Sequence, residues 1–209
     1  MGQIEAVLFD YGMVISAPPQ AAAWERLKAI SGLDEAAFHA GYWAYRHAYD
    51  RGTHTGEEYW RLAAEHAGGS VDEGQVAALL AADVDLWGDL NQPMVDWIWR
   101  LQEAGVKTGV LSNMGDAMEA GLSAKYPWLA KFDHRVWSYT LKLAKPEAEI
   151  YRHAVEGLGV AADRVLFVDD KAENIAAAEA AGLQGIVYGD HAVFERELRE
   201  RGWGSLLDV

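Results

Sequence analysis

The sequence predicts an α/β protein in which a helical domain is inserted into a doubly wound parallel sheet. Short apolar, β-branched segments alternate with helical patterns over residues 94–201, which is typical of a parallel sheet covered by helices on both faces. Residues 17–88 instead contain four helical patterns in succession and no comparable strand. We therefore expect a Rossmann-like core of residues 1–16 and 89–209, and a four-helix cap domain of residues 17–88.

Glycine and polar segments separate the expected cap helices, because glycine ends helices and Ser, Thr or Asp starts them. Asp34 and Thr55 are the expected N-caps. Gly32, Gly52 and Gly68 are the expected stops. The cap helices should therefore span residues 20–30, 35–49, 56–66 and 74–87.

The expected core strands are short and mostly apolar, which is the pattern of strands buried on both faces of a sheet. The strands are expected at residues 4–9, 106–113, 134–139, 164–170 and 184–189. The core helices are expected at residues 94–103, 116–125, 147–156, 173–181 and 194–201.

Composition limits the class of protein and its partners. With 209 residues, 51% of them hydrophobic, the chain can bury one core or a core with a smaller inserted domain. A net charge of -14, with no basic run, argues against nucleic acid and anionic membranes as partners. The lack of cysteine excludes disulfides and thiolate metal sites.

Location and oligomeric state are less constrained by the sequence. The first expected strand starts within a few residues of Met1, and no apolar run approaches ~18 residues, so we expect a cytoplasmic protein. The nine tryptophans are interpreted as packing residues or as a dimer surface, which leaves a homodimer open.

Polar residues stand at the carboxyl ends of several expected strands, where doubly wound sheets bind their ligands. These residues are Asp10, Ser112, Asn113, Asp169 and Asp170. Lys145 should lie near the same edge, just before a helix that Pro146 starts. Oxygen ligands suit Mg²⁺, while a lysine and a hydroxyl suit an anion, so this edge is a predicted site for Mg²⁺ and a phosphate.

Four segments together resemble the motifs of the haloacid dehalogenase superfamily of hydrolases, which is dominated by Mg²⁺-dependent phosphatases. In chain order the segments are LFDYGMVIS, GVLSN, LAKPEAEIY and VLFVDDKAENI. Their order, their spacing and the helical cap between the first two agree with that family over essentially the whole chain. The first motif is similar to that of a subgroup that includes bacterial sugar-phosphate phosphatases acting on glucose 1-phosphate.

The resemblance implies a role for each matched residue at the reacting centre. Asp10 would attack phosphorus and form an aspartyl-phosphate that water later cleaves. Ser112 and Asn113 would hold the phosphoryl group, and Lys145 would neutralise its charge.

The resemblance also implies a Mg²⁺ site. An oxygen of Asp10, the backbone carbonyl of Gly12 and the carboxylate of Asp170 would hold the ion, with Asp169 beside it directly or through water. Asn174 would orient Asp170 or a water on the metal.

Gly12 departs from the commoner phosphatase motif, in which a second acid protonates the leaving oxygen, a role worth about 10²–10⁴-fold in rate. The carbonyl of residue 12 survives the substitution, so metal binding is not put in doubt. Without that acid, we expect rates to fall steeply as the pKa of the leaving group rises. Alternatively, a metal-bound water or a cap residue such as His47 supplies the proton.

The cap pattern at residues 35–49 is both aromatic and basic. Aromatic residues at spacings of three or four are expected to form a buried stripe of Phe38, Tyr42, Tyr45 and Tyr49. Arg46, His47 and Arg51 are the better candidates for contacting a polar substrate.

The predicted function is hydrolysis of a small phosphate monoester, such as a sugar phosphate. One alternative is 2-haloacid dehalogenation, in which the aspartate attacks carbon without a metal. The paired acids Asp169 and Asp170 disfavour it, because without Mg²⁺ they would repel an anionic acid. Another alternative is a non-catalytic descendant that binds a phosphorylated metabolite or a protein partner, a reading that Gly12 keeps open.

Overall fold

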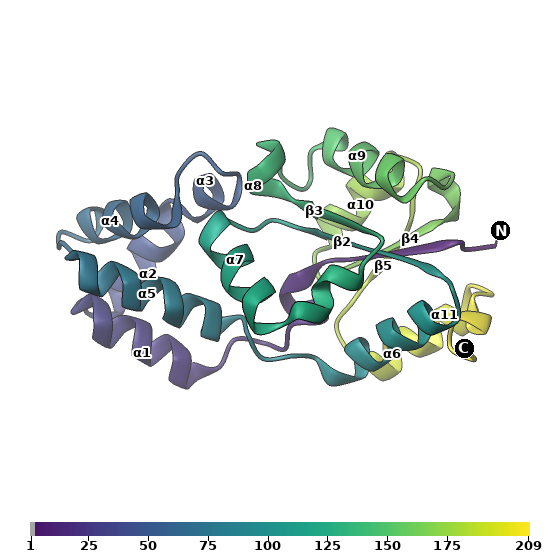
Figure 1. The fold of residues 1–209 in the computed structure, drawn as a ribbon, viewed down its shortest axis with the longest axis horizontal. Coiled ribbons are helices and arrows are strands. Elements are labelled where there is room, and N and C mark those ends of the chain that lie inside the picture. Colours follow the sequence, from purple (N-terminus) through teal and green to yellow (C-terminus); the bar gives the residue numbers. More distant parts are fainter. Residues whose placement is uncertain (1–2) are drawn as a thin grey trace.

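A computed structural model describes residues 3–209 of the chain, with helices α1 to α5 on one side and the sheet with its covering helices on the other (Figure 1). The sheet is wholly parallel, with the strand order β3-β2-β1-β4-β5. Its strands are β1 (Ala6–Phe9), β2 (Lys107–Ser112), β3 (His134–Trp137), β4 (Val165–Asp169) and β5 (Gln184–Val187). The first strand is therefore the central one, and its carboxyl end lies between those of β2 and β4.

Successive side chains of β1 point to opposite faces of the sheet, and both faces are buried. Val7 and Phe9 belong to one apolar cluster and Ala6 and Leu8 to another. The first cluster includes residues of α6 (Gln92–Glu103), α7 (Asp116–Lys125) and α11 (His191–Glu200). The second includes residues of α9 (Ala148–Leu158) and α10 (Ala172–Ala180). This arrangement confirms the doubly wound α/β fold.

The segment between β1 and α6 is helical, as predicted. Its helices are α1 (Ala21–Ser31), α2 (Glu35–Ala44), α3 (Arg46–Asp50), α4 (Gly56–His66) and α5 (Glu73–Leu86). Their buried side chains form a third apolar cluster, separate from the two that flank the sheet. The expected N-caps are confirmed, since Asp34 accepts a hydrogen bond from the Ala37 amide and Thr55 from that of Glu58. The division into core and cap remains a prediction.

One cap helix differs from the prediction. Residues 35–49 form two helices rather than one, because the backbone of Tyr45 leaves the helical conformation at φ -117° and ψ 2°. Phe38, Tyr42 and Tyr49 are buried as expected, whereas Tyr45 is only half-buried. The break redirects α3 toward the core, where it lies beside α8 (Ser138–Leu141) (Figure 1).

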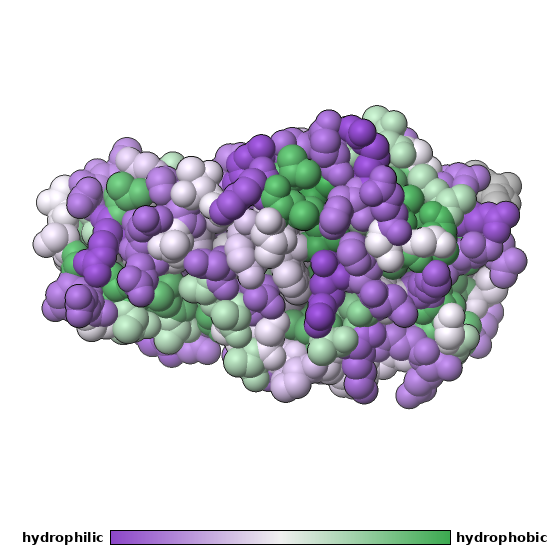
Figure 2. All heavy atoms as spheres, turned by 45° about the horizontal axis from the view of Figure 1, so that its top comes forward, coloured by the Kyte–Doolittle hydropathy of each residue, from purple (hydrophilic) through white to green (hydrophobic). Residues whose placement is uncertain are grey.

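The surface offers little to identify a partner. Hydrophilic side chains cover much of the face drawn in Figure 2, and hydrophobic residues form separate groups among them. Trp43 and Trp99 are exposed, but a homodimer remains a prediction. Within residues 3–209, every helix is too short or too polar to cross a membrane.

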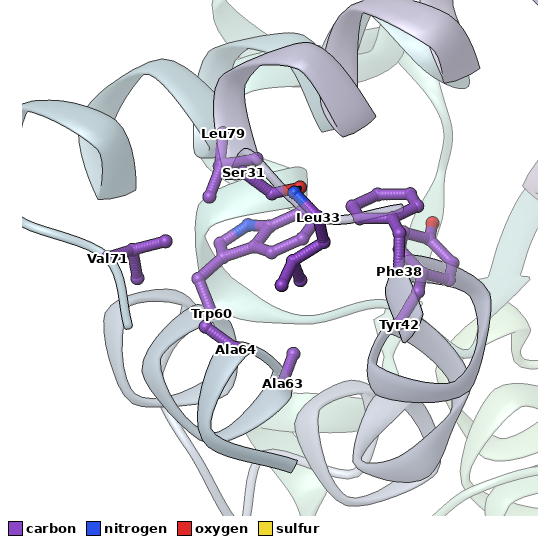
Figure 3. A pocket seen from close by; sticks show the side chains of 9 residues that line it. All are labelled: Ser31, Leu33, Phe38, Tyr42, Trp60, Ala63, Ala64, Val71 and Leu79. Atoms are coloured by element: carbon purple, nitrogen blue, oxygen red, sulfur yellow. Dashed lines mark hydrogen bonds between the residues drawn. The ribbon is translucent and has the colours of Figure 1, made fainter. Parts of the chain in front are cut away.

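A small cavity lies among the cap helices and is lined mostly by apolar side chains, with Ser31 and Tyr42 as the two residues that carry a hydroxyl (Figure 3). The side chains of Trp60, Phe38 and Tyr42 surround it together with Ser31. Its volume of about 10 Å³ is close to the minimum for one water molecule. We interpret this space as a packing gap in the cap rather than a substrate site.

Candidate active site

Asp10 leaves the sheet at its centre. The Asp10 amide still donates to the Val168 carbonyl of β4 at 2.9 Å, which fixes the backbone at the strand end. One carboxylate oxygen, Oδ1, then accepts a hydrogen bond from the Tyr11 amide at 2.7 Å. The turn that follows places Met13, not Gly12, in the left-handed conformation, with φ 60° at Met13 and φ -63° at Gly12.

Lys145 joins two of the strand ends. Its Nζ lies 2.8 Å from Asp10 Oδ1 and 2.7 Å from Asp169 Oδ2. Asn113, at the end of β2, holds the lysine backbone through two hydrogen bonds. The Lys145 amide donates to Asn113 Oδ1 at 2.8 Å, and Asn113 Nδ2 donates to the Lys145 carbonyl at 3.0 Å. The Asn113 side chain therefore positions the ammonium between the carboxylates.

Asp169 is fully buried, and both of its oxygens accept hydrogen bonds. Asn174 Nδ2 lies 2.9 and 3.0 Å from the two oxygens, and the Lys171 amide donates to Oδ1 at 2.8 Å. Of the two roles predicted for Asn174, orienting Asp170 is wrong by one position, since the amide holds Asp169, and orienting a water on the metal stays a prediction. Asp170 is only half-buried and borders the large cavity described below.

The strand ends carry more negative than positive charge. Oxygens of Asp10, Asp169 and Asp170 all lie within 4.8 Å of one another, and the Lys145 ammonium contacts two of these three carboxylates. Burial raises the pKa of Asp10 to about 6, and the charges of Asp169 and Asp170 add to this effect while Lys145 opposes it. For Lys145, burial disfavours the charge, but Asp10 and Asp169 outweigh it and raise the pKa.

This excess of carboxylate oxygens fits a hard divalent cation. Asp10, Gly12 and Asp170 border the cavity and could hold Mg²⁺ through two carboxylates and a backbone carbonyl. Asp169 belongs to the same oxygen cluster, but its hydrogen bonds to Asn174 and Lys145 give it a further role in holding the ammonium.

A cavity of about 300 Å³ extends from these strand ends to the cap. Every predicted site residue except Asp169 and Arg51 lines it, including Ser112 of β2. The cap contributes Trp43, Arg46, His47, Asp50 and Trp87. The two parts of the chain thus enclose the space in front of Asp10.

The basic cap candidates differ in what they can still contact. The Arg46 guanidinium is occupied, because Nη1 donates to Asp83 at 2.9 Å and Nε donates to Asp50 at 3.0 Å. Arg51 pairs with Glu147 of the core. His47 lines the cavity and is exposed, so of these cap residues it has the greatest freedom to reach a ligand.

Sequence reasoning missed Asp50. Its spacing of four residues from Arg46 could have suggested an ion pair on one helix. That spacing does not reveal that Asp50 also borders the cavity, because the break at Tyr45 separates α3 from α2.

Comparison with known proteins gives the family. The chain matches the model of the haloacid dehalogenase-like hydrolases over residues 4–182. It is 38% identical over 58 residues to a sesquiterpene phosphatase of Aspergillus oryzae, which covers 28% of this chain and 30% of that protein. It is 24% identical over 148 residues to bifunctional epoxide hydrolase 2 of Rattus norvegicus, which covers 69% of this chain and 27% of that protein. The matches therefore span less than a third of these curated relatives.

Solved structures share the fold. A haloacid dehalogenase family enzyme of Bacteroides thetaiotaomicron, in complex with magnesium and inorganic phosphate, superposes with a TM-score of 0.74 at 23% identity and covers 91% of this chain and 98% of its own. An L-2-haloacid dehalogenase of Xanthobacter autotrophicus superposes with a TM-score of 0.64 at 20% identity. The match covers 94% of this chain and 82% of the dehalogenase. Since the family model matches most of the chain, this protein belongs to the haloacid dehalogenase-like hydrolases.

Proposed function

We propose that this hydrolase is a Mg²⁺-dependent phosphatase that acts on a small phosphate monoester. The observation that carries the proposal is the cluster of Asp10, Asp169 and Asp170, with oxygens within 4.8 Å and one shared ammonium. Without a cation this cluster would repel any anionic substrate, whereas a bound dication would attract a phosphate. The magnesium and phosphate complex of the Bacteroides thetaiotaomicron enzyme supports this choice.

The geometry suggests how the chain's own residues act. The Tyr11 amide and Lys145 both contact Oδ1 of Asp10, so we assign the attack on phosphorus to Oδ2. Attack forms an aspartyl-phosphate and releases the alcohol, and water then cleaves the acyl phosphate. Lys145 and the Ser112 hydroxyl stabilise the phosphoryl oxygens. Bound Mg²⁺ would supply further positive charge at these oxygens.

The cavity limits the size of the substrate. Its volume of about 300 Å³ is at the lower end of the range for small-molecule sites. Trp43, Trp87 and Met13 give it an apolar wall, and His47 adds a polar group. A sugar phosphate presents both hydroxyls and a face of C–H groups, so sugar phosphates are the first class to test. Compact apolar phosphate esters are the second.

The test is release of inorganic phosphate from a panel of sugar phosphates, aryl phosphates and apolar alkyl phosphates, with Mg²⁺ and with EDTA. We expect turnover only with Mg²⁺ and its abolition in Asp10→Asn, whereas the exposed control Asp163→Asn should keep full activity. Halide release from 2-haloacids without metal would favour the dehalogenase alternative. A failure to hydrolyse any ester or haloacid would favour the non-catalytic one.

A further inference from the structure

We propose that Asp50, on the cap, is the acid that protonates the leaving oxygen in place of the carboxylate that Gly12 lacks. The inference rests on the proposed phosphatase function. Within residues 3–209, Asp50 is the only cap carboxylate that lines the cavity. The other acids in the wall, Asp10 and Asp170, are assigned to the nucleophile and the metal.

The surroundings of Gly12 require an acid from elsewhere. A Cβ built on Gly12 would meet one group within 4 Å, a ring carbon of Trp87 at 3.9 Å. An indole carbon cannot donate a proton to a leaving oxygen. Neither residue 12 nor the group nearest its Cβ position therefore supplies the proton, and we look for the donor elsewhere in the cavity wall.

Asp50 is fixed to the core beside the phosphate-binding strand end. The Asp50 carbonyl accepts a hydrogen bond from the hydroxyl of Ser138, a buried residue at the start of α8. The same hydroxyl accepts from the Met114 amide at 2.8 Å, just after Ser112 and Asn113. This bridge ties the end of α3 to the loop after β2, so Asp50 borders the cavity from a defined position.

The charges around Asp50 favour a proton on it. Asp50 and Asp83 share a single guanidinium, that of Arg46, at 3.0 and 2.9 Å. All three side chains are largely buried, with exposed fractions of 15% for Asp50, 3% for Asp83 and 10% for Arg46. The cluster therefore holds two acids and one base away from water, which is an excess of one negative charge if both acids ionise.

The two acids differ in their contacts. Asp83 accepts a hydrogen bond from the Tyr42 hydroxyl at 2.9 Å in addition to that from Arg46, whereas Asp50 borders the cavity. Burial raises the pKa of Asp50 to about 6, and the charge of Asp83 adds to this, while Arg46 and Lys171 act in the opposite direction. Arg46 lies on the same helix as Asp50, Asp83 lies on α5, and Lys171 lies in the loop after β4.

The proposed step is balanced in atoms and charge. As Asp10 forms a bond to phosphorus, the bond from phosphorus to the ester oxygen breaks, and that oxygen takes the proton of the Asp50 carboxyl and leaves as an alcohol. Asp50 is then a carboxylate. It removes a proton from the water that attacks phosphorus, the bond to Asp10 breaks, and phosphate leaves as Asp50 becomes protonated again.

Asp50→Asn tests the role through leaving groups. Against alkyl phosphates, whose leaving oxygen is strongly basic, we expect kcat/KM to fall by about 10²-fold or more, whereas 4-nitrophenyl phosphate should lose only a few fold. Glu57→Gln, which removes an exposed cap carboxylate, is the matched control, and His47→Gln tests the competing donor. An equal loss on both ester classes would indicate a structural role and overturn the proposal. A selective loss in His47→Gln, with none in Asp50→Asn, would assign the proton to His47.

A pH profile gives a second test that does not depend on the folding of Asp50→Asn. For an alkyl phosphate, kcat/KM should decline as pH rises through the pKa of Asp50. Asp83→Asn removes a charge that raises this pKa, so the decline should move to lower pH, while ionisation of the substrate is common to both proteins. An unchanged profile in a folded Asp83→Asn would overturn the proposal. If the wild type hydrolyses no ester at all, the phosphatase function itself fails.

Discussion

Asp50 is a buried acid whose ionisation opposes folding. Its pKa rises from 3.8 to about 6 on folding, so the folded protein binds the proton more tightly. The free energy of unfolding gained from this group is present below pH 3.8 and is lost as pH rises through about 6. Asp50→Asn should therefore stabilise the protein by about 1 to 3 kcal/mol at pH 8. Urea unfolding at pH 4 and pH 8 measures this, and equal effects at both would contradict it.

Gly12 has room for the acid that it lacks. Its φ of -63° suits any residue, and a Cβ would make only an ordinary contact with Trp87. In the Asp50→Asn background, Gly12→Asp should restore about 10-fold or more of the lost rate on alkyl phosphates. Gly12→Asn has the same size without the proton and should restore nothing. Equal rescue by both would show that residue 12 acts through packing instead.

At the scale of elements, the sequence predicts the central strands and their ends well. Residues 6–9 of β1 and 165–168 of β4 are all apolar because both faces of the sheet are covered. Asp10 follows β1 directly, Asp169 is the last residue of β4, and Asp170 comes next. The predicted cluster of acids at one edge is therefore confirmed. Parallel pairing alone brings these residues together, so no knowledge of distant contacts was needed.

The rest of the site depends on tertiary contacts that leave no pattern in the sequence. The aromatic spacing from Phe38 to Tyr49 continues across the break at Tyr45, so periodicity predicts one helix where there are two. The amide of Asn174 could have reached either neighbouring acid, and only packing selects Asp169. Asp50 was missed for the same reason, since the contact of α3 with α8 directs it.

The bridge through the Ser138 hydroxyl, which joins the end of α3 to the loop after β2, can be tested by removing that hydroxyl. Ser138→Ala leaves the Met114 amide and the Asp50 carbonyl without their shared partner in a buried place. We expect a loss of about 1–3 kcal/mol in the free energy of unfolding. Hydrolysis of alkyl phosphates should fall more than that of 4-nitrophenyl phosphate, because Asp50 is no longer fixed. Ser123→Ala, which removes a hydroxyl on α7, is the control, and an equal effect of both would contradict the account.

For the whole molecule, the proposed metal site predicts stabilisation by Mg²⁺. A cation that binds only the folded state raises the free energy of unfolding by about 2.7 kcal/mol at 100 times its Kd. Thermal unfolding with and without Mg²⁺ should show a higher Tm for the wild type and for Asp163→Ala, but not for Asp170→Ala. A shift that Asp170→Ala retains in full would mean that the metal lies elsewhere.

In the proposed mechanism, Asp10 carries the phosphoryl group during turnover. The most direct measurement is acid quenching of the enzyme during hydrolysis of a phosphate ester with Mg²⁺, followed by mass spectrometry of its peptides. We predict that the peptide containing Asp10 gains the mass of one phosphoryl group, and that Asp10→Asn gains none. Continued turnover with no phosphoryl group on Asp10, or with the group on another residue, would contradict the account.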